Sequence, residues 1–356
     1  MSQSKLSVVV GGQFGSEGKG AIAGHLSSPH GQPVVCVRVG GPNAGHTVLG
    51  HGPEGPKTPW RLRTIPVAAV TNPDATLVIA AGSEIDIDVL TTEGNLLEQY
   101  GHKVWERLII DHQATYLEPR HIQTETDLDI HRRIGSTAKG VGAARADRIM
   151  RTAQTWGDAH ATLGFNYKPL DTSQLLRDSL QDGYHVVIEG TQGYGLGLHA
   201  GYYPQCTSND ARAIDFLAMA GINPWDNHVD QFTVYLVARA NPIRVAGNSG
   251  PLRDETTWED LGLEPELTTV TRKVRRVGAW DGQLVNDAVA ANGGNRHVRL
   301  CLTMLDHAIP AAANWTGPLQ LLPERAKQFI QQVERDAGAT VVLAGTGPDT
   351  VAGEWS

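Results

Sequence analysis

A glycine-rich loop close to the first predicted strand leaves few folds open to this chain. Residues 11–20 read GGQFGSEGKG and directly follow three valines at 8–10. A strand, a glycine loop and a helix start place N–H groups and the helix dipole where they favour an anion, and Lys19 adds positive charge. The loop lacks the Walker A pattern, because Gly20 follows Lys19 in place of Ser or Thr. We predict a phosphate-binding loop; the alternative is a tight turn of structural use only.

Eight short apolar runs, each followed by a turn signal, predict buried β-strands. They are SVVVGG at 7–12, PVVCVRVGG at 33–41, ATLVIAAG at 75–82, RLIIDH at 107–112, HVVIEG at 185–190, QFTVYLVARA at 231–240, HVRLCLTMLD at 297–306 and TVVLAG at 340–345. Helical patterns at 83–100, 210–220 and 323–337 fall between them. This alternation predicts an α/β fold with a mainly parallel central sheet, helices on both faces and ligands at the carboxyl ends of the strands. Residues 1–356 are expected to form one domain, with a polar helical excursion at 117–158.

Charge and cysteine usage exclude several classes of protein. The formal net charge of −8 opposes non-specific binding to nucleic acid or to an anionic membrane. Cys36, Cys206 and Cys301 are too widely separated to predict a metal site or a disulfide framework, so buried reduced thiols are expected. The chain shows no signal-peptide pattern and no apolar run of transmembrane length. We expect a cytoplasmic protein with small-molecule partners, without nucleic-acid or membrane partners.

Two further loops carry polar groups suited to an anionic ligand. GGPNAGHT at 40–47 contains His46, which suits a general acid or a phosphate ligand, although a lone loop histidine is more often a surface residue. IGSTAKGVG at 134–142 offers hydroxyls and backbone N–H groups for a monophosphate. Three arginines follow it at helical spacing: Arg145, Arg148 and Arg151. A solvated basic helix face is the alternative for them.

Of the four remaining segments, three lie at the ends of predicted strands and one is a cationic cluster. In EGTQG at 189–193, the amide of Gln192 can read a base edge because it both donates and accepts hydrogen bonds. TRKVRR at 271–276 is a cationic cluster suited to a dicarboxylate or a polyphosphate, although such runs are usually solvated. LCLTMLD at 300–306 and GTGPD at 345–349 lie at the last two strand ends.

Seven segments together resemble, in order, the motifs of the adenylosuccinate synthetases. They are GQFGSEGKG, GGPNAGHT, IGSTAKGVG, EGTQG, YYPQCTS, LCLTMLD and GTGPD, and the resemblance runs from Val8 to Asp349. That family transfers a nucleotide γ-phosphate to the 6-oxygen of a purine monophosphate, and the aspartate amine then displaces it. The resemblance implies a homodimeric ligase that uses Mg²⁺, a purine nucleoside monophosphate, L-aspartate and a nucleoside triphosphate.

The resemblance also implies residue roles, with Ser16, Lys19, His46 and Gln192 as the catalytic set. Lys19 and the loop N–H groups hold the transferred phosphoryl, His46 assists its departure from the donor, and Gln192 orients the purine. The implied contacts of the monophosphate are Ser16, Asn43, Ser136, Thr137, Arg151 (across a dimer interface), Gln192, Thr207 and Lys273. Those of the donor nucleotide are Ser16, Glu17, Gly18, Lys19, Gly20, Gly45, His46, Thr47, Arg275, Met304, Asp306, Gly345, Thr346 and Gly347. Aspartate is assigned to Val270, Thr271, Lys273 and Arg275, and Mg²⁺ to Ser16 and the Gly45 carbonyl.

One departure from the family's motifs concerns the substrate. The family's first loop reads Gly-Asp-Glu-Gly-Lys-Gly, in which the Asp deprotonates purine N1 and binds Mg²⁺, whereas this chain has Ser16. A serine is smaller and neutral, so it leaves room for a purine 2-amino group and can accept its hydrogen bond. The change resembles the phage branch of the family, which converts guanylate or deoxyguanylate to a 2-aminoadenylosuccinate on the way to diaminopurine. We expect a (d)GMP–aspartate ligase; the alternatives are an ordinary synthetase using IMP and GTP, and an inactive nucleotide-binding regulatory protein.

A second departure concerns the donor base. The family's Thr-Lys-Leu-Asp motif is TMLD here, so Met304 replaces the Lys and Asp306 is kept. Asp306 favours guanine, whereas Met304 keeps an apolar stacking surface and removes a charge. An enzyme that consumes guanylate gains from a donor pocket that does not sequester guanine nucleotides. We predict that ATP or dATP serves as donor at least as well as GTP.

Overall fold

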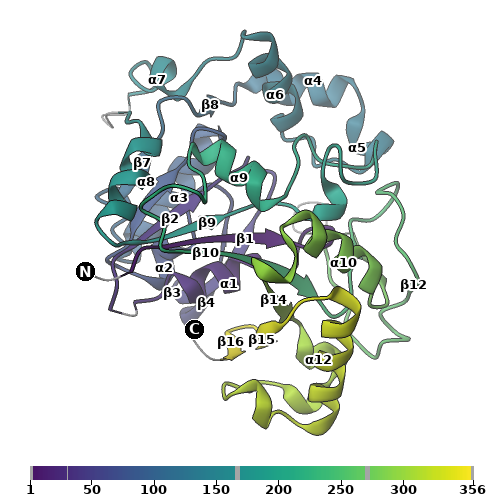
Figure 1. Ribbon diagram of the computed structural model, residues 1–356. Helices are drawn as coiled ribbons and strands as arrows, with labels where there is room; N and C mark the ends of the chain where they lie inside the picture. Colours follow the sequence, from purple (N-terminus) through teal and green to yellow (C-terminus); the bar gives the residue numbers. More distant parts are fainter. Residues whose placement is uncertain (1–2, 30, 165–168, 269–272, 354–356) are drawn as a thin grey trace.

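A nine-stranded sheet runs through the centre of the computed structural model, which describes residues 3–29, 31–164, 169–268 and 273–353 (Figure 1). In spatial order its strands are β16 (Thr350–Gly353), β15 (Val341–Gly347), β14 (Val298–Thr303), β10 (Gln231–Arg239), β1 (Lys5–Gly11), β9 (His185–Glu189), β2 (Val34–Arg38), β5 (Thr76–Ile79) and β7 (Leu108–Ile110). Every neighbouring pair is parallel except β15 with β16. All eight predicted strands are present, and the predicted α/β class is confirmed; β16 was not predicted.

Helices cover both faces of this sheet because successive strand residues point to opposite sides. In β1, Leu6, Val8 and Val10 belong to one apolar cluster, whereas Val9 belongs to the other. The first cluster packs against α8 (Thr172–Gln181), α9 (Ala213–Ala220), α10 (Gly282–Ala291) and α12 (Glu324–Ala337). The second packs against α1 (Lys19–Leu26), α2 (Ala68–Thr71) and α3 (Ile87–Gln99). Burial on two faces explains why these strands read as continuous apolar runs.

The predicted helices are present with shifted starts. α3 begins at Ile87 rather than Ser83, because Asp86 accepts hydrogen bonds from the N–H groups of Asp88 and Val89 and so caps the helix. α9 begins at Ala213 rather than Asp210, after a cap at Arg212. α12 keeps the predicted end, where Gly338 adopts φ 67°.

Residues 117–158 form helices α4 (Pro119–Asp127), α5 (Ile130–Ile134), α6 (Val141–Met150) and α7 (Trp156–Ala159). Figure 1 shows α4, α5 and α6 grouped beyond one end of the sheet strands. α11 (Leu305–Ala308) follows β14 directly. The start of α6 lies against the loop after β2, because a Cβ added at Gly41 would lie 2.6 Å from the Val141 side chain.

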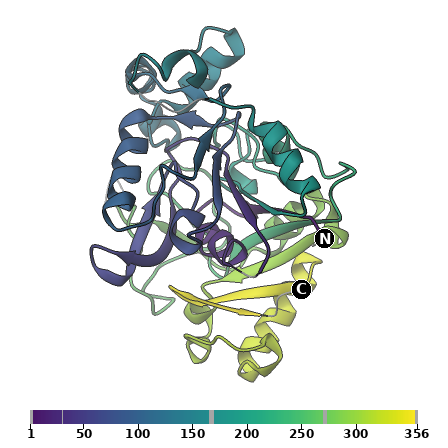
Figure 2. The same cartoon turned by 90° about the vertical axis from the view of Figure 1, so that its left-hand side faces the viewer.

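Three small sheets complete the fold. They are the hairpin β3 (His46–Gly52) with β4 (Gly55–Leu62), the pair β6 (Glu84–Ile85) with β8 (Thr115–Tyr116), and the triplet β11 (Ile243–Arg244), β13 (Arg276–Gly278) and β12 (Glu255–Thr256). The β3–β4 hairpin projects from the side of the molecule in Figure 2. His46 therefore begins a strand, where a loop position was expected.

The thiols agree only in part with the expectation of buried cysteines. Cys36 and Cys301 are buried and free, and burial raises the pKa of Cys36 to about 12. Cys206 is free but only half-buried. Among the residues described, no helix combines the length and apolar character needed to span a bilayer.

Candidate nucleotide-binding active site

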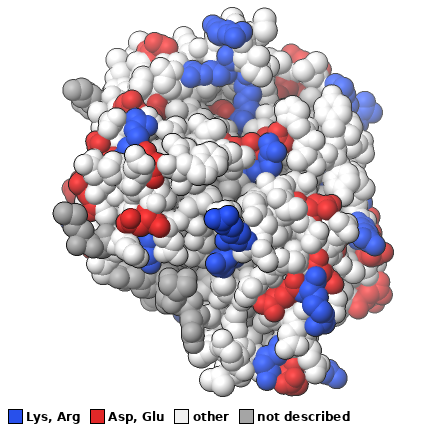
Figure 3. Space-filling view, viewed as in Figure 1, with Lys and Arg blue, Asp and Glu red and all other residues white. Residues whose placement is uncertain are grey.

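The candidate site lies at the carboxyl ends of the parallel strands. The phosphate loop follows β1, residues 40–47 follow β2, residues 190–193 follow β9, and Met304 follows β14. Because these strands run in the same direction, their final loops meet at one edge of the sheet. Figure 3 shows Lys and Arg side chains running from the top of the view to its centre around a hollow, although the whole chain is acidic. This edge therefore offers positive charge to an anionic ligand.

The phosphate loop is organised by its own glutamate. The fully buried carboxylate of Glu17 accepts hydrogen bonds from the N–H groups of Gln13 (3.2 Å) and Gly15 (2.8 Å). It also pairs with Nζ of Lys19 at 2.6 Å. The Glu17 side chain is thus bound within the loop. The N–H groups in the first turn of α1 have no acceptor within the helix, so they can bind an anion. The structure brings Glu17, Lys19 and the start of α1 together, but the Glu17 side chain, expected to contact the donor nucleotide, is buried and bound by Gln13, Gly15 and Lys19.

The first and second loops are in direct contact. A Cβ added at Gly20 would lie 2.6 Å from the carbonyl oxygen of Thr47 and 2.9 Å from Cβ of His46. Only glycine allows this approach, so Gly20 is explained by packing between the two loops. Gly45 and Thr47 are exposed beside this contact, and Asn43 is half-buried.

Ser16 lies at the exposed tip of the phosphate loop. Its backbone adopts φ 57°, in the left-handed region, and its carbonyl accepts a hydrogen bond of 3.3 Å from Nη1 of Arg239. Among the described residues, the Ser16 side chain has no hydrogen-bond partner. It is therefore free to contact a ligand.

His46 is held by two buried charges. Its Nδ1 lies 2.5 Å from Oε1 of Glu189 and 2.6 Å from Nη1 of Arg38. The Arg38–Glu189 ion pair, at 2.6 Å, is fully buried, and Oε2 of Glu189 accepts the N–H of Val67. A carboxylate only accepts, so the contact with Glu189 assigns the hydrogen to Nδ1; the contact of Nδ1 with Arg38 is then not a hydrogen bond, and Nε2 is left as an acceptor. Nε2 is buried and has no partner among the described residues.

The same contacts set the charges of Arg38, His46 and Glu189. Burial, together with the neighbouring positive charge of Arg38, lowers the pKa of His46 to about 4, although Glu189 acts in the opposite direction. Burial alone would raise the pKa of Glu189, but Arg38 and His46 bring it to about 2. At neutral pH the imidazole is therefore neutral and the carboxylate ionised. The sequence analysis identified His46 but assigned no role to Arg38 or Glu189. Each of these two is a charged residue at the end of an otherwise apolar strand, and that pattern could have identified them.

We expect His46 to make the protein less stable in acid. In an unfolded chain the histidine takes up a proton near pH 6.5, whereas in the folded protein it does so only near pH 4. Between these values the unfolded chain binds more protons, so the free energy of unfolding falls as the pH is lowered from 6.5 to 4. Urea unfolding across this range measures the slope. His46→Asn should show a shallower slope, and equal slopes in both proteins would contradict the assignment.

The third loop differs from the prediction in its backbone. The buried carboxylate of Glu125, from α4, accepts the N–H groups of Gly140 (2.7 Å), Gly142 (2.7 Å) and Ala143 (3.3 Å) at the start of α6. These N–H groups were expected to hold a monophosphate, and they are already occupied by an internal anion. Ser136 and Thr137 remain accessible, Thr137 being exposed.

The three arginines of α6 have different environments. Nε of Arg145 pairs with the buried Glu84 at 2.7 Å, and Nη2 of Arg148 donates to Gln113 at 3.0 Å. Arg151 ends α6 in a left-handed conformation (φ 64°) and is exposed. It has no side-chain hydrogen bond or ion pair with a described residue. Of these three arginines, only Arg151 is thus available to a ligand or a neighbouring subunit, so the alternative of a solvated basic helix face does not hold for all three.

Gln192 and Thr207 lie on the segment that follows β9. Gln192 adopts φ 63° and is half-buried. The N–H of Thr207 donates to the carbonyl of Leu196 at 2.7 Å, which leaves the half-buried hydroxyl for other contacts. Arg244 holds the neighbouring Gln205 carbonyl at 2.8 Å and stacks 4.3 Å from the ring of Phe14 in the phosphate loop. The segment is thus joined to the phosphate loop.

The cationic cluster lies only partly within the described residues. Val270 and Thr271, predicted to contact aspartate, lie outside them. Lys273 is exposed, and burial lowers the pKa of the half-buried Arg275. Arg276 forms an ion pair with Glu255 at 2.6 Å. Lys273 and Arg275 are therefore the described residues of this cluster that an anion can reach.

The segments assigned to the donor base contain half-buried and fully buried side chains. Met304 has φ 53° and, like Asp306, is half-buried at the start of α11. The hydroxyl of Thr346 is fully buried and donates to the carbonyl of Trp315 at 2.6 Å. Its side chain is therefore structural, and a donor contact there would be limited to the backbone of 345–347.

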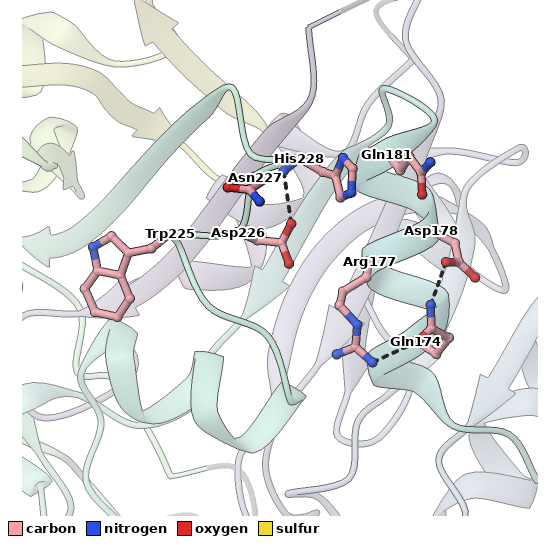
Figure 4. Close-up of a pocket in the computed structure, with 8 residues that line it drawn as sticks. All are labelled: Gln174, Arg177, Asp178, Gln181, Trp225, Asp226, Asn227 and His228. Atoms are coloured by element: carbon pink, nitrogen blue, oxygen red, sulfur yellow. Dashed lines mark hydrogen bonds between the residues drawn. The ribbon is translucent and has the colours of Figure 1, made fainter.

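A surface cavity of about 330 Å³ lies elsewhere (Figure 4). It is bounded by α8 and residues 225–228, which precede β10. Because those residues lie at the amino end of the parallel strands, the cavity is at the opposite edge from the predicted site residues. It contains none of them.

The sheet topology, the phosphate loop and the paired charges around His46 define a nucleotide-dependent α/β enzyme that handles phosphorylated ligands. Comparison with known proteins gives the family: the profile of the adenylosuccinate synthetases matches residues 8–168 and 165–310. This chain belongs to the adenylosuccinate synthetase family, ligases that form a C–N bond with aspartate.

Relatives of the same length support this assignment. The chain is 37% identical over 347 residues to the adenylosuccinate synthetase of Pyrococcus horikoshii, covering 96% of both chains. It is 35% identical, with the same coverage, to that of Methanococcus maripaludis.

Two solved structures share the fold. One is the succinoaminodeoxyadenylate synthetase of cyanophage S-2L, described as bound to dGMP and dATP, with TM-score 0.78, 26% identity and coverage of 97% of this chain and 93% of that one. The other is the fully ligated adenylosuccinate synthetase of Plasmodium falciparum, with TM-score 0.81, 20% identity and coverage of 98% and 99%. At that identity the second comparison shows the fold alone.

Proposed function

We propose that this protein joins L-aspartate to C6 of GMP or dGMP and produces a 2-aminoadenylosuccinate. The residue that carries the proposal is Ser16, to which the motif resemblance assigns the position of the family's catalytic Asp. It stands exposed on the phosphate loop without a side-chain partner among the described residues. A neutral side chain leaves room for a 2-amino group and accepts its hydrogen bond. The cyanophage structure, described as bound to dGMP and dATP, supports this reading.

The chemistry assigns separate tasks to the phosphate loop and to His46. Lys19 and the N–H groups at the start of α1 stabilise the phosphoryl group as it leaves the donor for the purine 6-oxygen. We propose that an anionic phosphate beside Nε2 of His46 favours protonation of that atom, so that it donates a hydrogen bond to the phosphate, while Glu189 stabilises the charged ring through Nδ1. Aspartate, held by Lys273 and Arg275, then attacks C6 through its amine, the C6–O bond breaks, and inorganic phosphate leaves.

Mg²⁺ fits this site as a metal carried by the nucleotide. Among the described residues there is no group of three or more His, Cys, Asp or Glu side chains able to hold a metal. Mg²⁺ in phosphoryl-transfer sites takes one or two protein oxygens and completes its shell with phosphates and water. The Ser16 hydroxyl and the Gly45 carbonyl are exposed oxygens of the required kind. When bound, the ion neutralises phosphate charge.

A substrate matrix tests the proposal. IMP, GMP and dGMP are each offered with aspartate and ATP, dATP or GTP, and products are identified by mass spectrometry. We expect product from GMP or dGMP, with ATP or dATP at least as effective as GTP. Product from IMP alone would favour an ordinary synthetase, in line with the archaeal relatives. No product in any combination would favour a nucleotide-binding regulatory protein.

Ser16→Asp is expected to reverse the substrate preference. The carboxylate crowds the 2-amino group, so kcat/KM for (d)GMP should fall about 10- to 200-fold, whereas use of IMP should rise. Aspartate tolerates the left-handed backbone at this position, so the fold should be retained. Steady-state rates with each monophosphate measure the change. Ser16→Ala is the control: it keeps the space and loses only the hydroxyl. An unchanged preference in Ser16→Asp would contradict the explanation.

We also propose a homodimer in which Arg151 serves the partner's site. Ile149 and Met150 are both 69% exposed beside Arg151, and large exposed apolar side chains of this kind mark protein interfaces. Arg151→Ala is expected to raise KM for the monophosphate about 10- to 100-fold, since a charge-assisted phosphate contact is lost. Mixing inactive Lys19→Ala with Arg151→Ala should restore activity through mixed dimers. A fully active monomer would exclude the shared site.

A further inference from the structure

Arg239 forms a buried junction at the end of β10. Its side chain is 1% exposed. Its backbone N–H donates to Oε1 of Gln13 at 3.0 Å, and its carbonyl accepts Nε2 of the same side chain at 3.1 Å. Gln13 belongs to the phosphate loop and is also buried. The backbone of Arg239 therefore fixes the first half of that loop.

The guanidinium of Arg239 reaches two different segments. Nη1 donates to the Ser16 carbonyl at 3.3 Å and to Oε2 of Glu266 at 3.3 Å. Nη2 donates to Oε1 of Glu266. The Glu266 carboxylate is thus held by both terminal nitrogens, and Arg239 lowers its pKa although burial alone would raise it. One side chain therefore joins the tip of the phosphate loop to Glu266.

Glu266 lies at the base of the segment that carries the accessible cations. Its carbonyl accepts the N–H of Arg275 at 2.8 Å. Further along, the N–H of Thr268 donates to the Lys273 carbonyl at 2.8 Å, and the N–H of Lys273 donates to the Thr268 hydroxyl at 3.0 Å. The described parts of this segment, residues 266–268 and 273–275, are therefore joined to each other by hydrogen bonds beside Glu266, and we call these six residues the basic loop.

We propose that Arg239 and Glu266 are positioning residues that couple anion binding on the basic loop to the placement of Ser16 in the phosphate loop. This inference rests on the proposed function, in which Lys273 and Arg275 hold aspartate. When a dicarboxylate binds those cations, the basic loop shifts. The bidentate ion pair between Glu266 and Arg239 transmits this shift to the Ser16 carbonyl. A two-pronged ion pair between rigid segments is suited to this, because it resists both rotation and stretching.

The test separates this coupling from a structural role. In the presence of the monophosphate and without aspartate, reversible phosphoryl transfer scrambles ¹⁸O within the donor triphosphate. Succinate, a dicarboxylate without an amine, serves as the probe of the basic loop. In wild type, saturating succinate should change the scrambling rate by at least about fivefold, the lower end of usual coupling between sites.

Glu266→Gln keeps the shape of the side chain and removes its charge. We expect this variant to raise KM for aspartate and to abolish the response of scrambling to succinate. Glu255→Gln is the matched control, because Glu255 pairs bidentately with Arg276 and contacts no phosphate-loop residue among those described. It should keep the succinate response within about twofold of wild type.

A second variant, Arg239→Lys, tests the other side of the same ion pair. Arg239→Lys keeps the positive charge but cannot donate from two nitrogens to Glu266. This variant should therefore fold and retain only a reduced succinate response. If Glu266→Gln and Arg239→Lys both respond to succinate as wild type does, the coupling is wrong. If wild type itself forms no aspartate-dependent product, the proposed function fails instead, and the two failures are thereby distinguished.

Discussion

His46→Asn is expected to lower kcat by about 10²- to 10⁴-fold, the usual contribution of a positioned proton-transfer group. The reason lies in the single free nitrogen of the ring. Nδ1 contacts Glu189 at 2.5 Å, and Nε2 is buried without a partner among the described residues, so Nε2 is the ring nitrogen that remains for a ligand. Asparagine fills part of the space but cannot exchange a proton at that atom. Steady-state rates at saturating substrate measure the loss.

His51→Asn is the matched control for this experiment. His51 lies on the same strand, β3, but is exposed, and its ring contacts Tyr100 rather than the strand ends. Its kcat should stay close to that of wild type. A similar loss in both variants would show that the effect comes from the hairpin as a whole. Normal kcat in His46→Asn would remove His46 from the mechanism.

Glu189→Ala is expected to lower the free energy of unfolding by about 3–5 kcal/mol, the usual cost of leaving a buried charge without its partner. Arg38 is fully buried and keeps its charge, so the guanidinium loses its carboxylate at 2.6 Å in a dry environment. The N–H of Val67 also loses its acceptor. Urea unfolding at neutral pH measures the difference.

The control for Glu189→Ala is Glu259→Ala, at an exposed position. A surface substitution of this kind should change the free energy of unfolding by about 0.5 kcal/mol or less. Glu189→Gln gives a second comparison, since its amide oxygen can still accept the N–H of Val67. Equal stabilities of Glu189→Ala and wild type would mean that Arg38 is not paired as described.

The strands of the central sheet were predictable because their environment is uniform. Each of the eight predicted strands is buried on both faces, and such a strand must be apolar along its length whatever its neighbours are. β3 and β4 were missed for the opposite reason. β4 carries two prolines and a glycine in eight residues, and the ribbon packs only partly against the core. Its composition is therefore that of a loop.

The candidate site was predictable in its residue types but not in its pairings. The glycine loops showed where an anion could be held, and their order pointed to the family that the comparisons confirmed. The sequence could not show that Arg145 is taken up by Glu84, whereas Arg151 has no such partner among the described residues. It also could not show that Glu125 occupies the N–H groups of α6.

The α/β class, the strand ends at which loops gather and the family could all be inferred from the sequence, because they depend on local composition and on motifs in a fixed order. Which charges remain available depends on how the chain packs. Arg38 and Glu189 are separated by 151 residues, and Arg239 and Glu266 by 27. A charge is neutralised by whichever opposite charge the fold brings within a few ångströms, and burial then sets the strength of that pairing. Such proximity is a property of the packed sheet, and no local pattern encodes it.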